Sequence, residues 1–379
     1  METREAPRRA NDPTAPRHPL LRALAFVAVF VFLFVTCSYI LRPIYIGGNL
    51  SRINVSGFYA EKRNSLDMVY IGGSNTFTYW APLDAWQSHG IASYLFAVNA
   101  MAGDAIRYYV TETGKTQRPK LFVIDLKQFA ADGEGPLGNY NNTTLSFNYS
   151  LNRFAMIEAL YPAGERLIQH IDLFQFHTRW QEVDREALRY AFNRVRNERK
   201  GFWFLTDTDT DTGHFVQDCS AVTARAALSD SARQALTALM EVCGRVSYGA
   251  EFLFVVSPHT DLTPEAKARY NTIGDVVTSY GFTFLDLNDK FTEMGLDPSL
   301  DFANQRHTNV FGAEKYTAWL ADYIDAQYAL PDRRGEARYA GWDADYAAWT
   351  VSLANAKQTA LDKRSGAAVE TAEDGVTVG

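Results

Sequence analysis

A run of uncharged and largely apolar residues near the start of the chain, residues 23–41, most constrains what this sequence can fold into. At a rise of about 1.5 Å per residue, a helix of this length spans about 28 Å, close to the hydrocarbon thickness of a bilayer. A helix in the core of a soluble domain is usually apolar on one face only, whereas this segment is apolar all round. We therefore expect a membrane-spanning helix over residues 20–42.

The charges that flank this segment predict its orientation. The positive-inside rule places the arginine-rich side in the cytoplasm and the rest of the chain, from about residue 43, outside it. A cleaved signal peptide is the alternative, but the apolar run exceeds the ~7–15 residues usual for such peptides, and no A-x-A-like site follows. We expect a single-pass anchor in the cell membrane with a cytoplasmic tail over residues 1–19. The flanking arginines are Arg4, Arg8, Arg9, Arg17 and Arg22 before the segment, and Arg42 and Arg52 after it.

Composition excludes several classes of protein. The chain is 47% hydrophobic and 13% aromatic, which is unlike a disordered protein. Its net charge of −7 and the lack of a basic stripe argue against nucleic acid as a partner. Three cysteines without C-x-x-C spacing argue against a structural zinc site, and we expect neither a metal nor a cofactor. Cys219 and Cys243 lie in the exported part, where a disulfide and two buried thiols are both open alternatives.

Short apolar runs alternate with helical patterns over residues 65–330. Near-continuous apolar strands that alternate with helices predict a parallel sheet covered on both faces, and hence an α/β domain. The expected strands are residues 67–71, 94–98, 120–126, 252–257 and 282–287, and the expected helices are residues 80–89, 104–116, 220–247, 264–280 and 312–328.

The other segments differ from this alternation in composition. Residues 43–64 are interpreted as a linker. Residues 130–219 form an insertion rich in Asn and aromatic residues, either a lid over the site or a packed helical appendage, with a charged surface helix over residues 181–198. Residues 331–379 predict a short docking helix, from aromatic residues at helical spacing, and then a disordered tail from about residue 356.

Two segments that follow expected strands carry reactive side chains. The first is the turn Gly72-Gly73-Ser74-Asn75-Thr76, which would expose a serine hydroxyl beside backbone N–H groups, as a nucleophile and an oxyanion hole require. The second, residues 301–309, contains His307. Ligands bind at the carboxyl ends of strands in open parallel sheets, so His307 is placed to deprotonate Ser74, with a carboxylate such as Asp301 to orient its ring.

Alternatives remain for each of these signals. The glycine turn can be no more than a turn, and as a phosphate cradle it lacks both G-x-G-x-x-G and the P-loop lysine. The G-x-S-x-G elbow of α/β-hydrolases is also absent. His259 and Asp125 lie at strand ends as well, where His259 either enters the pocket or is a solvated turn residue. Arg306 either contacts an anionic substrate or faces water.

With Ser74 after the first strand and His307 before the last helix, the sequence resembles the SGNH (GDSL-like) hydrolases over residues 65–328. It is most similar to a membrane-anchored, extracytoplasmic branch, which includes the D-alanine-transfer protein of teichoic acid synthesis and the alginate O-acetylation proteins. The resemblance implies a flavodoxin-like three-layer α/β/α sandwich. It also implies that Ser74 is the nucleophile, that His307 is its base, and that the Gly103 N–H joins the Ser74 N–H in the oxyanion hole.

The chain departs from the family pattern at three positions. Gly73 stands where the family has Asp. The asparagine of the third block has no clear counterpart, and Gln128 would replace it as a donor only if it points inward. Asn304 stands three residues before His307, where the family has Asp, so either Asn304 or Asp301 orients the imidazole. Asn75 and Asn99 are further candidates for the pocket.

These observations together predict an extracytoplasmic serine esterase or O-acyltransferase. It would act on an acylated cell-envelope glycan or polymer through an acyl-Ser74 intermediate. The resemblance also implies a membrane-bound O-acyltransferase as a partner. The alternative is a non-catalytic SGNH-like envelope protein that binds glycan or serves as a scaffold for a membrane acyltransferase complex.

Overall fold

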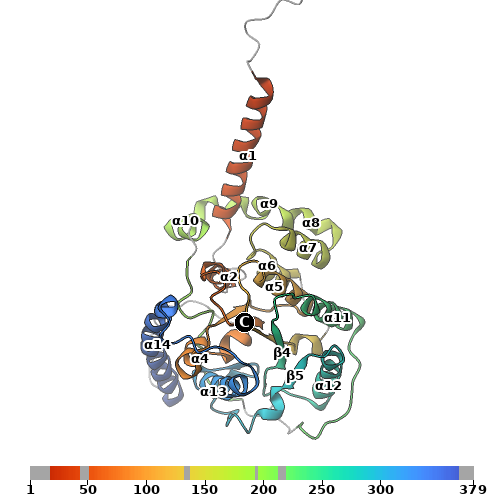
Figure 1. The fold of residues 1–379 in the computed structure, drawn as a ribbon, viewed down its shortest axis with the longest axis vertical. Helices are drawn as coiled ribbons and strands as arrows, with labels where there is room; N and C mark the ends of the chain where they lie inside the picture. Colours follow the sequence, from red (N-terminus) through yellow and green to blue (C-terminus); the bar gives the residue numbers. More distant parts are fainter. Residues whose placement is uncertain (1–17, 43–50, 132–136, 193–194, 212–218, 367–379) are drawn as a thin grey trace, which may run out of the picture.

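The computed structural model describes residues 18–42, 51–131, 137–192, 195–211 and 219–366. Its centre is a five-stranded sheet in the order β2-β1-β3-β4-β5, with every neighbouring pair parallel (Figure 1). The predicted α/β class with a parallel sheet is therefore confirmed, and each strand lies within a few residues of its predicted position. The strands are β1 (Met68–Gly72), β2 (Ser93–Ala97), β3 (Leu121–Asp125), β4 (Glu251–Val256) and β5 (Thr283–Asp286).

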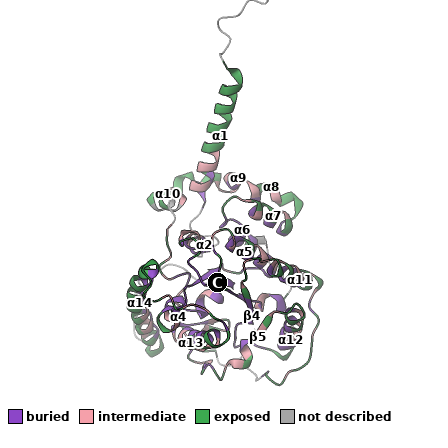
Figure 2. Cartoon of the chain, in the orientation of Figure 1, coloured by how far each residue is buried: buried purple, intermediate pink, exposed green. Residues whose placement is uncertain are grey.

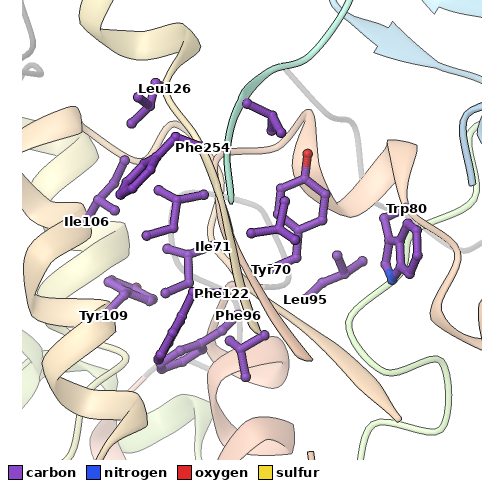
Figure 3. Packing of buried hydrophobic residues seen from close by; sticks show 14 of the residues in the cluster. Tyr70, Ile71, Trp80, Leu95, Phe96, Ile106, Tyr109, Phe122, Leu126 and Phe254 are labelled. Atoms are coloured by element: carbon purple, nitrogen blue, oxygen red, sulfur yellow. The ribbon is translucent and has the colours of Figure 1, made fainter. Parts of the chain in front are cut away.

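The two faces of the sheet are both buried, as the continuous apolar runs require. Successive side chains of a strand point to opposite faces. Tyr70 on β1 pairs with Leu95 on β2, and Ile71 pairs with Phe96. Figure 3 shows Ile71 and Phe96 on the side of α5 (Ile106–Thr113), with Tyr70 and Leu95 on the opposite side. All four side chains are fully buried.

Helices cover both faces of the sheet. α5, α11 and α12 pack side by side on one face, and α4, α13 and α14 pack together on the other (Figure 1). Ser229, Thr263 and Asn309 cap α11, α12 and α13 through their side-chain oxygens. The Ser229 cap also explains why α11 is shorter than the helix predicted over residues 220–247. The bounds are α4 (Pro82–His89), α11 (Asp230–Gly244), α12 (Pro264–Ser279), α13 (Val310–Gln327) and α14 (Ala340–Ser365).

The apolar N-terminal segment forms α1 (Pro19–Leu41), which is long and apolar enough to cross a membrane. Figure 2 shows that most of this helix is exposed and extends away from the α/β domain. A core helix of a soluble protein would be buried along one face, so the exposure of α1 agrees with the span predicted over residues 20–42.

The prediction of a linker over residues 43–64 is wrong for its second half. Residues 51–60 form α2 (Ser51–Ala60), which packs on β2 and buries Val55 and Phe58 completely. The Asn54 amide also donates a hydrogen bond of 2.7 Å to Ala97 O at the end of β2. These contacts explain the helix, because packing supplies stability that a short polar-looking segment lacks alone. Residues 43–50 lie outside the described residues.

The insertion predicted over residues 130–219 is largely helical where the structure describes it. Its later helices gather around the base of α1, as expected for a packed appendage rather than a lid (Figure 1). α6 packs against α2 and α7, and its Asn142 donates to Asn99 O in the loop that follows β2. The charged helix predicted over residues 181–198 appears as the shorter α10. The helices are α6 (Leu137–Thr144), α7 (Leu151–Leu160), α8 (Ala163–His170), α9 (Asp172–Phe176) and α10 (Arg185–Phe192).

The C-terminal helix α14 is longer than predicted. Disorder is expected from about residue 356, but the helix continues to Ser365 because Ala356 and Ala360 are buried against Val310 at the start of α13. Small side chains allow this close packing, which composition alone does not reveal. The expected tail beyond residue 366 lies outside the described residues.

Candidate active site

The serine predicted as nucleophile lies on a tight turn after β1. The turn connects Gly72 directly to α3 (Thr76–Tyr79). A Cβ atom on Gly72 would lie 2.0 Å from Thr76 Oγ1, and one on Gly73 would lie 2.9 Å from Gln128 Nε2. Close packing therefore requires the glycine at position 72, whereas a side chain at position 73 would displace only the end of the Gln128 side chain. The turn leaves Ser74 half-buried at the carboxyl edge of the sheet.

The histidine lies on a small antiparallel hairpin that precedes α13. The hairpin pairs β6 (Phe302–Asn304) with β7 (His307–Thr308), and its register places Asn304 opposite His307. Asn304 Oδ1 accepts a hydrogen bond of 3.0 Å from Arg306 N within the turn. Thr308 Oγ1 donates a hydrogen bond of 2.7 Å to Thr78 O, which ties the hairpin to α3 and hence to the serine turn.

These two loops bring together the side chains of Ser74, His307 and Asn304. Ser74 Oγ lies 2.8 Å from His307 Nε2, across 233 residues of sequence, and His307 Nδ1 lies 2.8 Å from Asn304 Oδ1. An amide oxygen only accepts hydrogen bonds, so the proton of the neutral ring is on Nδ1 and Nε2 is the acceptor for the serine hydroxyl. This is the tautomer that a general base for serine requires.

The prediction that Asp301 orients His307 is wrong. Asp301 is buried, and its Oδ2 accepts hydrogen bonds from Lys315 Nζ at 2.6 Å and from Asp297 N at 2.7 Å. Of the two alternatives that the sequence leaves open, the structure selects Asn304. The physical reason is the hairpin, whose two-residue turn places the residue three before His307 directly opposite the ring.

The surroundings of His307 keep its imidazole neutral. The pKa of His307 is lowered to about 4, mainly by burial and to a smaller extent by the nearby cations Lys127 and Arg306. A charged partner would oppose these effects, but Asn304 is neutral. At neutral pH the ring is therefore unprotonated and able to accept the proton of Ser74.

Lys127 is a site residue that sequence reasoning missed. Its ammonium nitrogen is buried and has no hydrogen-bond partner among the described residues. Burial lowers the pKa of Lys127 to about 8, although the carboxylates of Asp125 and Asp261 act to raise it. The only sequence signal was its place at the end of β3, next to Gln128.

A buried polar cluster of Asp125, Asn75 and Ser257 holds the serine turn in place. Asp125 at the end of β3 is fully buried, and its carboxylate accepts hydrogen bonds from Asn75 Nδ2 at 2.7 Å and from Ser257 Oγ. Burial raises the pKa of Asp125, against these hydrogen bonds. The side chain of Asn75, predicted to line the pocket, is thus turned toward this cluster and positions the turn that carries Ser74.

The groups predicted to donate to an oxyanion differ in whether their N–H groups already make hydrogen bonds within the protein. With its amide oriented to pair at both ends, Gln128 accepts from Gly73 N at 3.1 Å and donates to Asp125 O at 3.3 Å. The Gly73 N–H and one of the two amide N–H groups of Gln128 are therefore occupied. No acceptor within the described part of the chain bonds the backbone N–H of Ser74 or of Gly103, which begins the short helix η1 (Gly103–Ala105).

His259 supports the site rather than entering its hydrogen-bond chain. Its Nδ1 lies 2.5 Å from Asp261 Oδ1 and its Nε2 lies 3.0 Å from Tyr270 Oη, so both ring nitrogens are engaged. Arg306 Nε donates to Asp261 Oδ2 at 3.0 Å, and Thr260 N donates to Gln305 O at 2.9 Å. These contacts hold the histidine hairpin beside the loop after β4.

Asn99 lies at the edge of a cavity of about 420 Å³, between α2, residues 195–203 and α14. Phe77 of α3 also lines this cavity, but Ser74 and His307 do not. The backbone N–H of Asn99 donates to Ser51 Oγ at 3.2 Å, which joins the loop after β2 to the start of α2. The cavity thus adjoins the serine turn without containing the reactive pair.

The acidic, histidine and cysteine side chains that the structure describes form neither a metal site nor a disulfide. Among the described residues, no group of three or more His, Cys, Asp or Glu side chains is arranged to hold a metal ion. Cys219 and Cys243 are both buried and are not joined by a disulfide. Comparison with known proteins adds no assignment, because no family model matches the chain and no curated protein matches it.

Proposed function

We propose that the protein transfers or hydrolyses an ester-linked acyl group through Ser74. The observation that carries this proposal is the 2.8 Å contact between Ser74 Oγ and His307 Nε2, with Asn304 at the other ring nitrogen. The hydroxyl proton passes to His307 as Oγ attacks the acyl carbonyl. The imidazolium then protonates the departing alcohol, which leaves an acyl-Ser74 ester.

The second half of the reaction reverses these roles. Water or a glycan hydroxyl would give its proton to His307 and attack the acyl-Ser74 carbonyl, which releases an acid or a new ester and restores the serine. The backbone N–H groups of Ser74 and Gly103 would donate to the oxyanion in both steps. Asn304 would hold the ring in the useful tautomer but would add no charge to stabilise the imidazolium.

The fold and the anchor extend the proposal. The strand order 2-1-3-4-5 is that of flavodoxin-like sheets, in which ligands bind at the carboxyl ends of the strands. This order supports an SGNH-like domain with Ser74 after its first strand. With α1 as a single-pass anchor and its arginine-rich flank in the cytoplasm, the domain would act on an acylated glycan or polymer of the cell envelope, in partnership with a membrane-bound O-acyltransferase.

A non-catalytic envelope protein is the second candidate. Two observations favour it: Asn304 provides no carboxylate for His307, and the Gln128 amide is paired at both ends. In such a protein the same edge of the sheet would bind glycan without turnover.

An esterase assay separates the two candidates. The full-length protein would be given p-nitrophenyl acetate, with Ser74→Ala and His307→Ala as test variants and the exposed Ser88→Ala and His177→Ala as matched controls. We expect both test variants to lose about 10²–10⁴-fold in kcat/KM, as for removal of a nucleophile or base. Equal turnover in wild type and all four variants would leave only the binding protein.

A further inference from the structure

Exposed apolar side chains outside α1 are concentrated in one part of the insertion. We define the collar as residues 149–192 that the structure describes, which contain α7 to α10 and the short helix η3 (His177–Glu182). Elsewhere in the described α/β domain, large apolar side chains are exposed only singly, at Tyr280, Leu300, Val351 and Leu361. In the collar the clearest examples, each more than two-fifths exposed, are Leu151, Phe154, Leu167, Phe174, Trp180 and Leu188.

The collar lies around the domain end of α1. Figure 1 shows α10, α9 and α8 side by side at the base of this helix, with α7 beneath α8, and α1 contacts α9, α10 and η3 directly. Arg179 Nη1 donates to Leu41 O at 3.3 Å, and the rings of Tyr39 and Tyr149 meet edge to face at 5.4 Å. These contacts fix the height of the collar along the axis of the anchor.

A buried ionic cluster strengthens this attachment. Asp172 at the start of α9 accepts hydrogen bonds from both Arg42 and Arg153, and all three side chains are almost fully buried. Arg42 Nη1 also donates to Phe147 O at 3.1 Å. The guanidinium of Arg42 therefore joins the end of α1 to the collar and to the segment that leads into it.

The length of α1 places the collar at the membrane. The uncharged residues 23–33 of α1 are exposed, and at 1.5 Å per residue they span about 16 Å. A bilayer core of about 30 Å needs about 20 helical residues, so the rest of the uncharged run, residues 34–41, must lie within it as well. These residues belong to the part of α1 that becomes largely covered as it meets the collar.

We propose that the collar inserts its exposed apolar side chains into the bilayer interface, on the side of the membrane that the domain occupies. Helices with apolar faces lie in this boundary between headgroups and acyl chains, and Trp and Tyr side chains are enriched there. A bilayer fits better than a protein partner because the apolar side chains are spread over successive helices at one end of the anchor. The collar fixes the orientation of the α/β domain relative to the membrane.

The charges of the collar agree with apolar rather than electrostatic binding. Arg179 pairs with Glu182, and Arg166 and His170 pair with Glu158. With its cations partly neutralised in this way, the collar needs no anionic lipid. This inference depends on α1 as a membrane span and is independent of the chemistry proposed for Ser74.

Quenching of Trp180 by lipid tests the inference. Trp180 is the only tryptophan among the described residues that is largely exposed, so Trp180→Phe removes little but its fluorescence. The full chain would be reconstituted in phosphatidylcholine vesicles that contain lipids brominated on the upper acyl chain. We expect bromolipid to quench the component of emission that Trp180→Phe lacks, with a blue-shifted maximum. Equal quenching of wild type and Trp180→Phe would overturn the proposal.

A pair of labelled variants provides the matched control. In a Cys37→Ala background, Leu167→Cys in the collar and Val351→Cys on α14 would each carry an NBD fluorophore. We expect the label at residue 167 to shift to shorter wavelength and gain intensity in vesicles, and the label at residue 351 to report water. Water-like emission at both positions, with Trp180 quenched by acrylamide, would show that the collar lies outside the bilayer and would overturn the proposal.

Discussion

At the scale of single residues, the site combines a reactive pair that the sequence predicts with neighbours that it does not. Ser74 and His307 stand out because a glycine turn and a late histidine both follow strands of a parallel sheet. The sequence narrows the partner of His307 to Asn304 or Asp301, and the register of a short hairpin decides between them. The burial of the Lys127 ammonium depends on tertiary packing, which the sequence does not reveal.

The neutral partner of His307 leads to a prediction about pH. In Asn304→Asp, a carboxylate would face Nδ1 and favour the imidazolium, so the pKa of His307 would rise from about 4 toward or above its usual 6.5. Wild-type kcat/KM would then fall only as the pH approaches about 4, whereas that of the variant would fall at a higher pH. Profiles of kcat/KM against pH would measure both acid limbs, and coincident limbs would contradict the role assigned to Asn304.

Asn304→Ala tests the same role by deletion. We expect it to lower kcat/KM by about 10–100-fold, because the ring loses the acceptor that selects its tautomer. The free energy of unfolding should change little, since Asn304 is exposed. An unchanged rate would mean that the hairpin backbone alone orients the imidazole.

Lys127 leads to a second pH prediction. The unfolded chain takes up a proton on this residue near pH 10.5, whereas the folded protein does so only near pH 8. Between these values the unfolded state binds more protons, so the stability of the wild type should rise with pH. Lys127→Met should lack this rise and should also shift the acid limb of His307 upward. Parallel unfolding curves for both proteins from pH 8 to 10.5 would show that the ammonium is not buried.

At the scale of elements, the strands and the helices between them follow from the sequence, whereas the short elements and the length of α14 do not. The five strands are continuous apolar runs, and α12 begins at the Thr263-Pro264 cap as its pattern indicates. Residues 43–64 are predicted as a linker, yet residues 51–60 form α2, which packs on β2. The hairpin of β6 and β7 is too short for any periodicity to reveal, and its register decides which residue meets His307.

A variant of Asp301 tests whether this residue stabilises the loop before the hairpin without taking part in the reaction. Asp301→Ala would leave Lys315 and the Asp297 N–H without their acceptor. Because Lys315 is partly exposed, we expect a loss of about 1–3 kcal/mol in the free energy of unfolding. The acid limb of kcat/KM should stay where it is in the wild type. A shifted limb with unchanged stability would restore Asp301 as the partner of His307.

At the scale of the whole molecule, the collar attaches α1 to the α/β domain. The sequence predicts the anchor from its length and apolarity, but the attachment depends on Arg42, which bonds Asp172 across 130 residues of sequence, and on Arg153, which bonds the same carboxylate. Burial acts to raise the pKa of Asp172, and the two guanidiniums outweigh it and hold the pKa below its usual range.

Removing the charge of Asp172 should weaken the attachment of α1 to the collar. In Asp172→Asn, two buried guanidiniums would lose their counter-ion, which costs about 3–5 kcal/mol for a buried pair. We expect faster proteolysis between α1 and the collar in reconstituted protein, with Glu158→Gln, on an exposed pair, as the control. Equal proteolysis of both variants would show that the ionic cluster does not hold the anchor.

The contact between Ser74 and His307 is tested most directly by a fluorophosphonate probe, which modifies only activated serines. Peptide mapping of the labelled full-length protein would identify the modified residue. The account predicts labelling at Ser74 in wild type, none in Ser74→Ala, and a large loss of labelling in His307→Ala. Wild-type protein that is unlabelled at Ser74, or labelling that persists undiminished in His307→Ala, would contradict it.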